Sequence, residues 1–367
     1  MQQEQLVLPR GVTVRGSGGE RYVVEDLLGR GEMSAVYLVR DRHVSGNVFA
    51  LKEVINPDKH DRERFLFEAR VLKRLYHSAL PRVYRVFENN KLKRVYIVMD
   101  YIQGRNLEEL RKEQPDSRFS LPLVIALMSP IVKALTYLHA QNPPIIHRDI
   151  KPANVIIPVG ADEAMLVDFG SAKEYIPGGT ATIVSRRTPG YAAPEQYVSG
   201  TSPRTDVYGL GATLYTLLTG TPPVDALSRT ALNWDTGIDP LKRADVLVSA
   251  VSVSVAEALQ RAMALPSADR FATIEEFWQE LTSHTEAQPV QIPRVTSANV
   301  LQPPDDTEAI MAVAEATLAV ARARQRASLS IWRGILILIL VILLLTLAFE
   351  AILYFHVWML AIFITLT

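Results

Sequence analysis

The stretch that decides the fold is His147-Arg148-Asp149-Ile150-Lys151-Pro152-Ala153-Asn154. It comes between a helical pattern and the apolar run at 155–157, which places its polar residues in a loop between a helix and a strand. The order H-R-D-x-K-P-x-N is long and specific, so chance is a negligible explanation for it. This loop is therefore the first candidate for the part of the chain that carries chemistry.

Further motifs lie on both sides of this loop. Asp168-Phe169-Gly170 begins fourteen residues past Asn154, and Ala193-Pro194-Glu195 and Asp206-Val207-Tyr208-Gly209-Leu210-Gly211 follow it. Upstream, the strand-like run Phe49-Ala50-Leu51-Lys52 ends on a lysine, and Glu68 lies in the next helical pattern. A lone lysine is usually a solvated charge, but a buried Glu68 could pair with Lys52 and hold its ammonium group. Together, the order and spacing of these motifs leave coincidence no serious role.

A glycine-bearing stretch, Gly29-Arg30-Gly31-Glu32-Met33-Ser34-Ala35-Val36, lies between two strand-like runs. Glycines let the backbone approach the phosphates of a nucleotide, and Val36 could pack over an adenine ring. Taken alone, the stretch is about as consistent with a hairpin that binds nothing.

These residues resemble the eukaryotic-like (Hanks-type) Ser/Thr protein kinase family, in its bacterial membrane-anchored branch, over roughly residues 22–281. The resemblance implies an α+β fold, with a β-rich N-lobe at about 21–102 and a helical C-lobe at about 103–283. Strand-like runs at 21–28, 35–40, 48–54 and 95–101 precede the helical patterns, which also favours a sheet-rich lobe followed by a helical one. The remaining zones are a polar lead (1–20), a linker (284–304), a juxtamembrane helix (305–333) and a transmembrane segment with its tail (334–367).

The resemblance implies catalytic roles for Asp149, Lys151, Lys52 and Glu68. Asp149 would accept or orient the proton of the substrate hydroxyl, and Lys151 is the residue typical of Ser/Thr kinases. Asn154 and Asp168 would hold Mg²⁺, with Mn²⁺ as an alternative, and Lys52 would contact the phosphates of ATP. The positions that the resemblance assigns to the nucleotide pocket are Gly29, Gly31, Ser34, Val36, Ala50, Lys52, Met99, Asp100, Ile102, Asn154 and Asp168. Ser34 replaces the third glycine of the usual pattern, and other family members also vary there.

Structural roles are implied in the same way. Leu72, Val83, His147 and Phe169 would form an apolar stack between the lobes, with Asp206 as its anchor, and Glu195 would pair with Arg270. Arg148 is typical of kinases that are activated by phosphorylation of the loop before Ala193-Pro194-Glu195. Thr180 and Thr182 are the phosphorylation candidates in that loop, and ordinary loop hydroxyls are the alternative. Thr188 is expected to form a hydrogen bond near Asp149 instead.

Composition narrows the partners. Lys plus Arg and Asp plus Glu each total 39, so there is no basic field for nucleic acid, and no cysteine is present for disulfides or thiolate chemistry. The resemblance implies proteins with Ser or Thr acceptors as substrates and a second copy of the chain in transient trans-autophosphorylation, and a lipid bilayer is the third expected partner.

The bilayer is expected from the apolar zone Gly334–Leu366. A helix reaching from Gly334 to about Tyr354 would match the ~30 Å hydrocarbon core. Arg322, Arg324, Arg326 and Arg333 precede this zone and no Lys or Arg follows it, which predicts a single-pass cell-membrane protein with a cytoplasmic kinase domain. A short hairpin in place of one crossing stays open.

Three functions are compatible with the motifs. The first is an ATP-dependent, non-specific Ser/Thr protein kinase with loop autophosphorylation. The second is a catalytically silent kinase-fold scaffold, against which the intact Lys52, Asp149, Asn154 and Asp168 argue. The third is a small-molecule kinase, which the Ala193-Pro194-Glu195 segment disfavours.

Overall fold

The computed structural model describes residues 7–30, 34–42, 47–55, 57–89, 92–161, 163–175, 188–198, 200–283 and 295. The chain divides into one unit at Met1–Leu301 and a second at Gln302–Thr367, and every described residue belongs to the first unit. The expected juxtamembrane helix, the expected transmembrane segment, Gly31, Thr180 and Thr182 lie outside the described residues.

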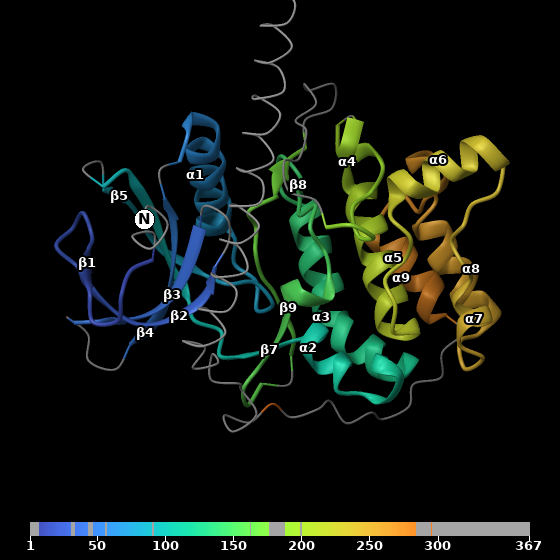
Figure 1. Ribbon diagram of the computed structural model, residues 1–367, viewed down its shortest axis with the longest axis horizontal. Coiled ribbons are helices and arrows are strands. Elements are labelled where there is room, and N and C mark those ends of the chain that lie inside the picture. The colour runs from blue at the N-terminus through green and yellow to red at the C-terminus, as the bar shows by residue number, and fades with distance from the viewer. Residues whose placement is uncertain are drawn as a thin grey trace, which may run out of the picture. The chain divides into compact units, whose positions relative to one another are not determined.

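The N-lobe is built on a six-stranded antiparallel sheet in the order β1-β2-β3-β4-β6-β5. Its strands are β1 (Thr13–Arg15), β2 (Arg21–Arg30), β3 (Ser34–Asp41), β4 (Val48–Ile55), β5 (Val83–Asn89) and β6 (Arg94–Asp100). One helix, α1 (Lys59–Arg74), connects β4 to β5, and Figure 1 shows it beside the blue strands. The four strands expected from sequence are confirmed to within two residues at each end, and β1 and β5 were not foreseen.

The N-lobe sheet is apolar on both faces. One face packs with α1 through residues such as Val54 and Ile97, which share a core with Phe65 and Leu72. The opposite face carries its own core of aromatic and β-branched side chains, made of Tyr22, Val24, Ala35, Tyr37, Val39, Leu51, Phe87, Tyr96 and Val98. Val14 also belongs to this outer core, and Val7 and Leu8 pack against it. The expectation of a merely polar lead at 1–20 is therefore wrong from Val7 onward, because its few apolar residues cover the sheet.

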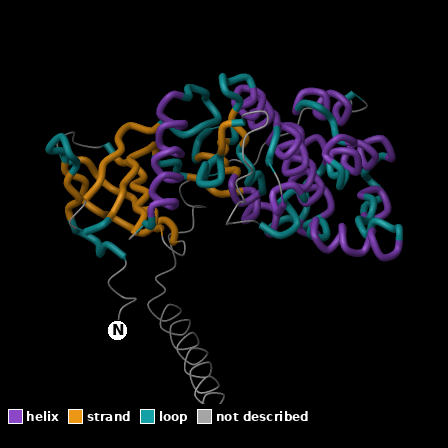
Figure 2. Tube along the Cα trace, turned by 90° about the horizontal axis from the view of Figure 1, so that it is seen from above, coloured by secondary structure: helices purple, strands orange, loops and turns teal. Residues whose placement is uncertain are grey.

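The C-lobe is mostly helical, as Figure 2 shows by its purple tubes. Its α-helices are α2 (Leu107–Lys112), α3 (Leu121–His139), α4 (Glu195–Val198), α5 (Pro203–Thr219), α6 (Ala226–Thr236), α7 (Ala244–Leu247), α8 (Val253–Ala262) and α9 (Ile274–Thr282). Single-turn 3₁₀ helices lie at η2 (Pro115–Ser117), η3 (Pro152–Asn154) and η4 (Ser267–Asp269). Two small sheets complete the lobe, one of β7 (Gly104–Asn106), β9 (Val155–Pro158) and β10 (Met165–Leu166), the other of β8 (Ile145–Ile146) and β11 (Lys173–Glu174).

Helix α5 is the centre of the C-lobe, because every residue from Thr205 to Leu218 is buried. A capping box between Ser202 and Thr205 begins the helix, and Gly220, with a φ of 79°, ends it in the left-handed conformation. A Cβ on Gly211 would lie 2.9 Å from the Cβ of Ala262, so glycine allows α8 to pack closely on α5. The result is a rigid support directly under the loop at 147–154.

Among the described residues, one helix, α3, is long and apolar enough to cross a membrane. Eight residues of α3 are buried, so in this structure α3 is a core helix of the C-lobe. Val295, inside the expected linker, is also buried, and its carbonyl accepts a hydrogen bond from the amide of Gly160 at 3.3 Å. At Val295 the linker is therefore packed on the C-lobe.

Candidate active site

Lys52 lies at the contact between the two lobes. From β4, its Nζ donates to Glu68 Oε1 on α1 at 2.7 Å and to Asp168 Oδ1 at 3.2 Å. Burial alone would lower the pKa of Lys52, but the negative charges of Glu68 and Asp168 outweigh it and raise that pKa. In turn, the ammonium group of Lys52 holds the pKa of Asp168 well below its usual range. The expected pairing of Lys52 with Glu68 is thus present, and both Lys52 and Asp168 are charged at neutral pH.

Asp168 and Gly170 hold the other side of this cluster in a tight turn. Asp168 has a φ of 64°, and the amide of Gly170 donates back to Asp168 Oδ1 at 3.3 Å. A Cβ on Gly170 would lie 3.2 Å from Asp168 Oδ1 and 3.6 Å from Lys52 Nζ. Glycine therefore leaves room for the carboxylate and the ammonium group to meet. The Asp168 side chain is 51% exposed, so its carboxylate is open to a further ligand.

Asp149 is surrounded by the polar groups that its loop and the segment after it supply. Lys151 Nζ donates to Asp149 Oδ2 at 2.8 Å and to Thr188 Oγ1 at 2.8 Å, and Thr188 Oγ1 donates to Asp149 Oδ1 at 2.9 Å. Thr188 is therefore where it was expected, joined to both Asp149 and Lys151. This arrangement fixes one carboxylate beside one hydroxyl and one ammonium group.

Asn154 brings the metal-binding candidates together. Its Nδ2 donates to the carbonyl of Asp149 at 2.8 Å and to Asp149 Oδ2 at 3.0 Å, and its carbonyl accepts from the amide of Val167 at 2.9 Å. Because Val167 directly precedes Asp168, the last bond fixes the spacing between Asn154 and Asp168. The side-chain bonds use Nδ2, which leaves the amide oxygen of Asn154 for a metal. Oxygen donors of this kind suit Mg²⁺, which is usually held by one or two carboxylates and by substrate phosphates. The described part of the chain contains no cluster of three or more His, Asp or Glu residues that could hold a metal.

The loop at 147–154 is anchored from below by Asp206 on α5. The amides of His147 and Arg148 each donate to its carboxylate at 2.8 Å, and His139 Nε2 lies 2.8 Å from its Oδ2. Burial would raise the pKa of Asp206, but the bonds from His139 and the loop outweigh it and lower that pKa. The expected anchor is confirmed, and the contribution of His139 was missed because a lone histidine near a helix end gives no signal in the sequence.

The apolar stack expected between the lobes consists of buried residues, since Leu72, Val83, His147 and Phe169 are each at most 4% exposed. His147 and Phe169 contact edge to face, with ring centroids 4.8 Å apart. The burial of His147 lowers its pKa despite the nearby charges of Asp206, Asp149 and Asp168, so its ring is neutral.

The candidate adenine pocket lies on the inner face of the sheet. Cross-strand pairs place Ala50 opposite Met99 and Val36 opposite Lys52, so these side chains share one face. Gly29 pairs with Val36 at the end of β2, and Ser34 begins β3. The structure thus places Val36, Ala50, Lys52 and Met99 on one face of the sheet, with Gly29 opposite Val36.

Asp100, at the end of β6, has several of its polar groups already bonded within the N-lobe. The amide of Asp100 already donates to the carbonyl of Arg82 at 3.0 Å, and its side chain accepts from Arg82 N and Tyr84 Oη. Asp100 is the last residue of β6, and Arg82 before β5 and Tyr84 within β5 use these polar groups. The resemblance implies that the backbone from Asp100 to Ile102 binds the base, and because the amide of Asp100 is already bonded, this stays a prediction for its carbonyl and for Ile102.

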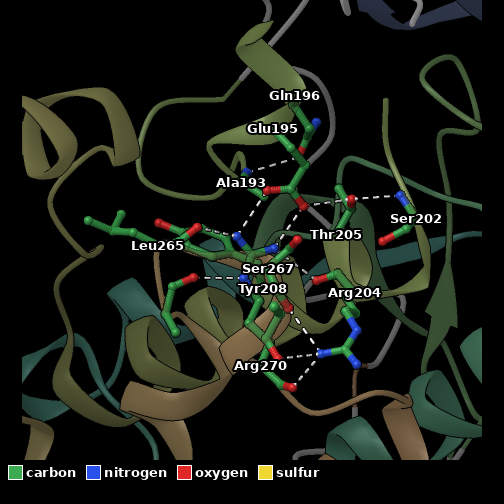
Figure 3. A network of polar contacts seen from close by, with 12 residues as sticks. Ala193, Glu195, Gln196, Ser202, Arg204, Thr205, Tyr208, Leu265, Ser267 and Arg270 are labelled. Carbon is green, nitrogen blue, oxygen red and sulfur yellow. Dashed lines mark hydrogen bonds and ion pairs between the residues drawn. The ribbon is translucent and has the colours of Figure 1, made fainter. Parts of the chain in front are cut away.

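Glu195 and Arg270 form the buried pair that the sequence predicted (Figure 3). Arg270 Nη1 lies 2.7 Å from Glu195 Oε1 and Nη2 lies 2.9 Å from Oε2, a bidentate geometry. Arg270 also donates to the carbonyls of Ala264, Leu265 and Arg204, and its guanidinium lies over the ring of Tyr208. Thr205 Oγ1 donates to Glu195 Oε1, which ties the pair to the start of α5. These contacts join α4, α5 and the segment before α9.

Comparison with known proteins agrees with this geometry. Residues 22–281 match the family model of the protein kinase domain. The chain is 32% identical over 274 residues to the probable serine/threonine-protein kinase PknB of Corynebacterium glutamicum, in an alignment that covers 71% of this chain and 42% of PknB. It is 37% identical over 226 residues to the serine/threonine-protein kinase PkaA of Streptomyces coelicolor, covering 56% of this chain and 40% of PkaA. The crystal structure of the PknI kinase domain of Mycobacterium tuberculosis superposes with a TM-score of 0.58 at 27% identity, covering 76% of this chain and 99% of that domain. The matched part of the chain thus spans less than half the length of these two curated relatives.

Proposed function

Because the chain belongs to the protein kinase family, we propose that it is an ATP-dependent Ser/Thr protein kinase that transfers the γ-phosphoryl group of Mg²⁺-bound ATP to protein hydroxyls. The observation that carries this proposal is the joint placement of Lys52, Asp149, Asn154 and Asp168 with the partners that each needs. A silent scaffold would not need a lysine held by two carboxylates at the contact between the lobes.

The residues divide the chemical work between them. ATP supplies the phosphoryl group when it is bound with its metal. Lys52, oriented by Glu68, would bind phosphate oxygens, and Asn154 and Asp168 would hold Mg²⁺. Asp149 accepts the proton of the substrate hydroxyl, and Lys151 places positive charge beside it. Thr188 fixes the second oxygen of Asp149, so that the carboxylate has one orientation toward an incoming hydroxyl.

Activation by phosphorylation of Thr180 or Thr182 is part of the proposal. Burial lowers the pKa of Lys173, and the positive charge of the nearby Arg148 lowers it further. Two cations held near one another would be stabilised by a phosphate group. Trans-autophosphorylation then requires a transient dimer.

We also propose a membrane tether through the apolar zone at 334–367, with the kinase unit in the cytoplasm. Its support is the composition of that zone and the four arginines before it. Protease protection of a C-terminal tag tests it, because one crossing leaves the tag outside the cell and a hairpin leaves it inside.

The function is tested with the full chain in detergent, incubated with γ-labelled ATP and Mg²⁺. The wild type and Asp149→Asn are compared, and modified residues are mapped by mass spectrometry. Label on Ser or Thr in the wild type alone supports the kinase, and label on Thr180 or Thr182 supports activation through the loop. Equal absence of label in both proteins, with ATP still bound, would favour the scaffold.

A further inference from the structure

Strand β4 carries two charged residues side by side, and they face opposite ways. Lys52 points to the inner face and the candidate active site, whereas Glu53 points into the outer core and is 0% exposed. Burial of a carboxylate is costly unless it is paired. The catalytic assignments above give Glu53 no role.

Glu53 is paired by residues from the two strands that flank β4. Tyr37 Oη on β3 donates to Glu53 Oε2 at 2.8 Å, and Arg94 Nη1 on β6 donates to Glu53 Oε1 at 2.6 Å. Each carboxylate oxygen is therefore held by a different neighbouring strand. We call Tyr37, Glu53 and Arg94 the rear cluster.

The segment at residues 7–15 closes the rear cluster from outside. The amide of Leu8 donates to Tyr37 Oη at 3.0 Å, so this hydroxyl accepts from the segment while it donates to Glu53. Burial raises the pKa of Tyr37, which keeps the hydroxyl protonated and able to donate. Residues 7–15 precede the kinase-domain match, which begins at residue 22.

The rear cluster acts on the register of β4. Val36 and Ile97 pair with Lys52, and Ala35 and Tyr96 pair with Glu53. A shift of β4 by one residue would turn Lys52 to the outer face and Glu53 toward the inner one, because the side-chain period of a strand is two. The shift would also break the bonds that Tyr37 and Arg94 donate to Glu53.

We propose that the rear cluster is a positioning site that fixes β4 so that Lys52 faces the nucleotide, and that residues 7–15 complete it through the amide of Leu8. The nucleotide role of Lys52 rests on the proposed function, whereas the control of β4 does not. Glu53 acts through Lys52 and does not touch substrate, so it is a positioning residue.

The test uses the full chain with Glu53→Gln, which keeps the shape and removes the charge. The phosphoacceptor is the inactive Asp149→Asn chain. We expect kcat/KM for ATP to fall at least tenfold, with KM for the acceptor within twofold of the wild type. Hydrogen exchange, followed by mass spectrometry, should be at least tenfold faster in the peptide that contains β4.

Two controls separate positioning from general destabilisation. Val39→Ala removes volume from the same outer core but leaves Tyr37, Glu53 and Arg94 unchanged. It should lower the melting temperature and leave kcat/KM for ATP unchanged. Leu8→Pro deletes the donated N–H and should reproduce part of the Glu53→Gln effect, whereas Leu8→Ala keeps the N–H and should not.

Identical exchange in β4 for Glu53→Gln and Val39→Ala would overturn the proposal, as would unchanged ATP kinetics in Glu53→Gln. If the wild type transfers no phosphate, the proposed function is wrong, but that result says nothing about the rear cluster. The exchange comparison then still decides whether the rear cluster controls β4.

Discussion

Asp206 holds Arg148 in a left-handed backbone conformation. The amide of Arg148 donates to Asp206 Oδ1 at 2.8 Å, and Arg148 has a φ of 67°. Such a conformation costs a residue other than glycine ~1–3 kcal/mol and persists only where its surroundings compensate. Because Asp149 is the next residue, the bond to Asp206 sets the direction in which the side chain of this candidate catalytic residue points from the loop.

Asp206→Asn should therefore reduce catalysis more than nucleotide binding. The amide that replaces one oxygen would face a backbone N–H, so the loop would shift, and a misplacement of about 1 Å can lower kcat ~100-fold. Steady-state kinetics with varied ATP checks this, and KM for ATP should stay within about threefold. The exposed Asp235→Asn on α6 is the control and should behave as the wild type. Equal loss in both variants would contradict the anchoring role.

Stability should fall between pH 7.5 and 5.5 because of His147. Burial holds its pKa below the ordinary value, so the unfolded chain binds a proton near pH 6.5 that the folded chain does not bind. Above pH ~6.5 the neutral His147 makes its full contribution to the free energy of unfolding. As the pH falls from 7.5 to 5.5, up to ~1.4 kcal/mol of this free energy is lost. Urea unfolding of the wild type and His147→Leu at both pH values measures it. His77, whose pKa burial also lowers, remains in both proteins, so their difference isolates His147. Parallel pH dependence in the two proteins would be inconsistent with a neutral buried His147.

Gly170→Ala should weaken the use of Mg²⁺-bound ATP. Its Cβ would crowd Asp168 Oδ1 at 3.2 Å and lies within 4 Å of Lys52 Nζ, so the carboxylate must move. We expect kcat/KM for ATP to fall ~10–100-fold, in the range of a misplaced catalytic group. Gly200→Ala is the matched control, because its Cβ would meet no atom within 4 Å. Titration with Mg²⁺ at fixed ATP is the measurement, and an unchanged Mg²⁺ dependence would refute the crowding argument.

Arg270→Met should be the most destabilising of these substitutions. It leaves Glu195, which is 12% exposed, without its bidentate partner, and removing one member of a buried pair costs ~3–5 kcal/mol. For a domain of this size, that corresponds to a melting temperature lower by ~10 °C. The control is Arg118→Met, whose partner Asp116 is 72% exposed and whose loss should cost at most ~1 kcal/mol. Similar thermal shifts in the two variants would count against the anchor.

The sequence predicted the site well where short motifs determine contacts. The pair Lys52–Glu68, and the pair Glu195–Arg270 and the bonds of Thr188 that the resemblance to protein kinases implies, are each present. These residues are informative because their chemistry needs both the residue type and the spacing.

What could not be predicted depends on partners without a local signal. Glu53 in an alternating strand has the same pattern whether it is solvated or buried, and its partners Tyr37 and Arg94 lie 16 and 41 residues away. The coverage of the outer face by Val7 and Leu8 was missed for a related reason. A short segment with few apolar residues resembles a solvated lead until the surface beneath it is known.

The contact between Glu195 and Arg270 also governs when the C-lobe can close during synthesis. The two residues are 75 positions apart in the chain. At ~5–20 residues per second, the ribosome needs about 4 to 15 s to add Arg270 after Glu195. Throughout that interval the nascent lobe has one half of its anchor and lacks α9, and α5 is completed within its first third. We therefore expect the C-lobe to fold only once Arg270 has been translated, so that a chain truncated before Arg270 exposes its apolar core residues and has no activity.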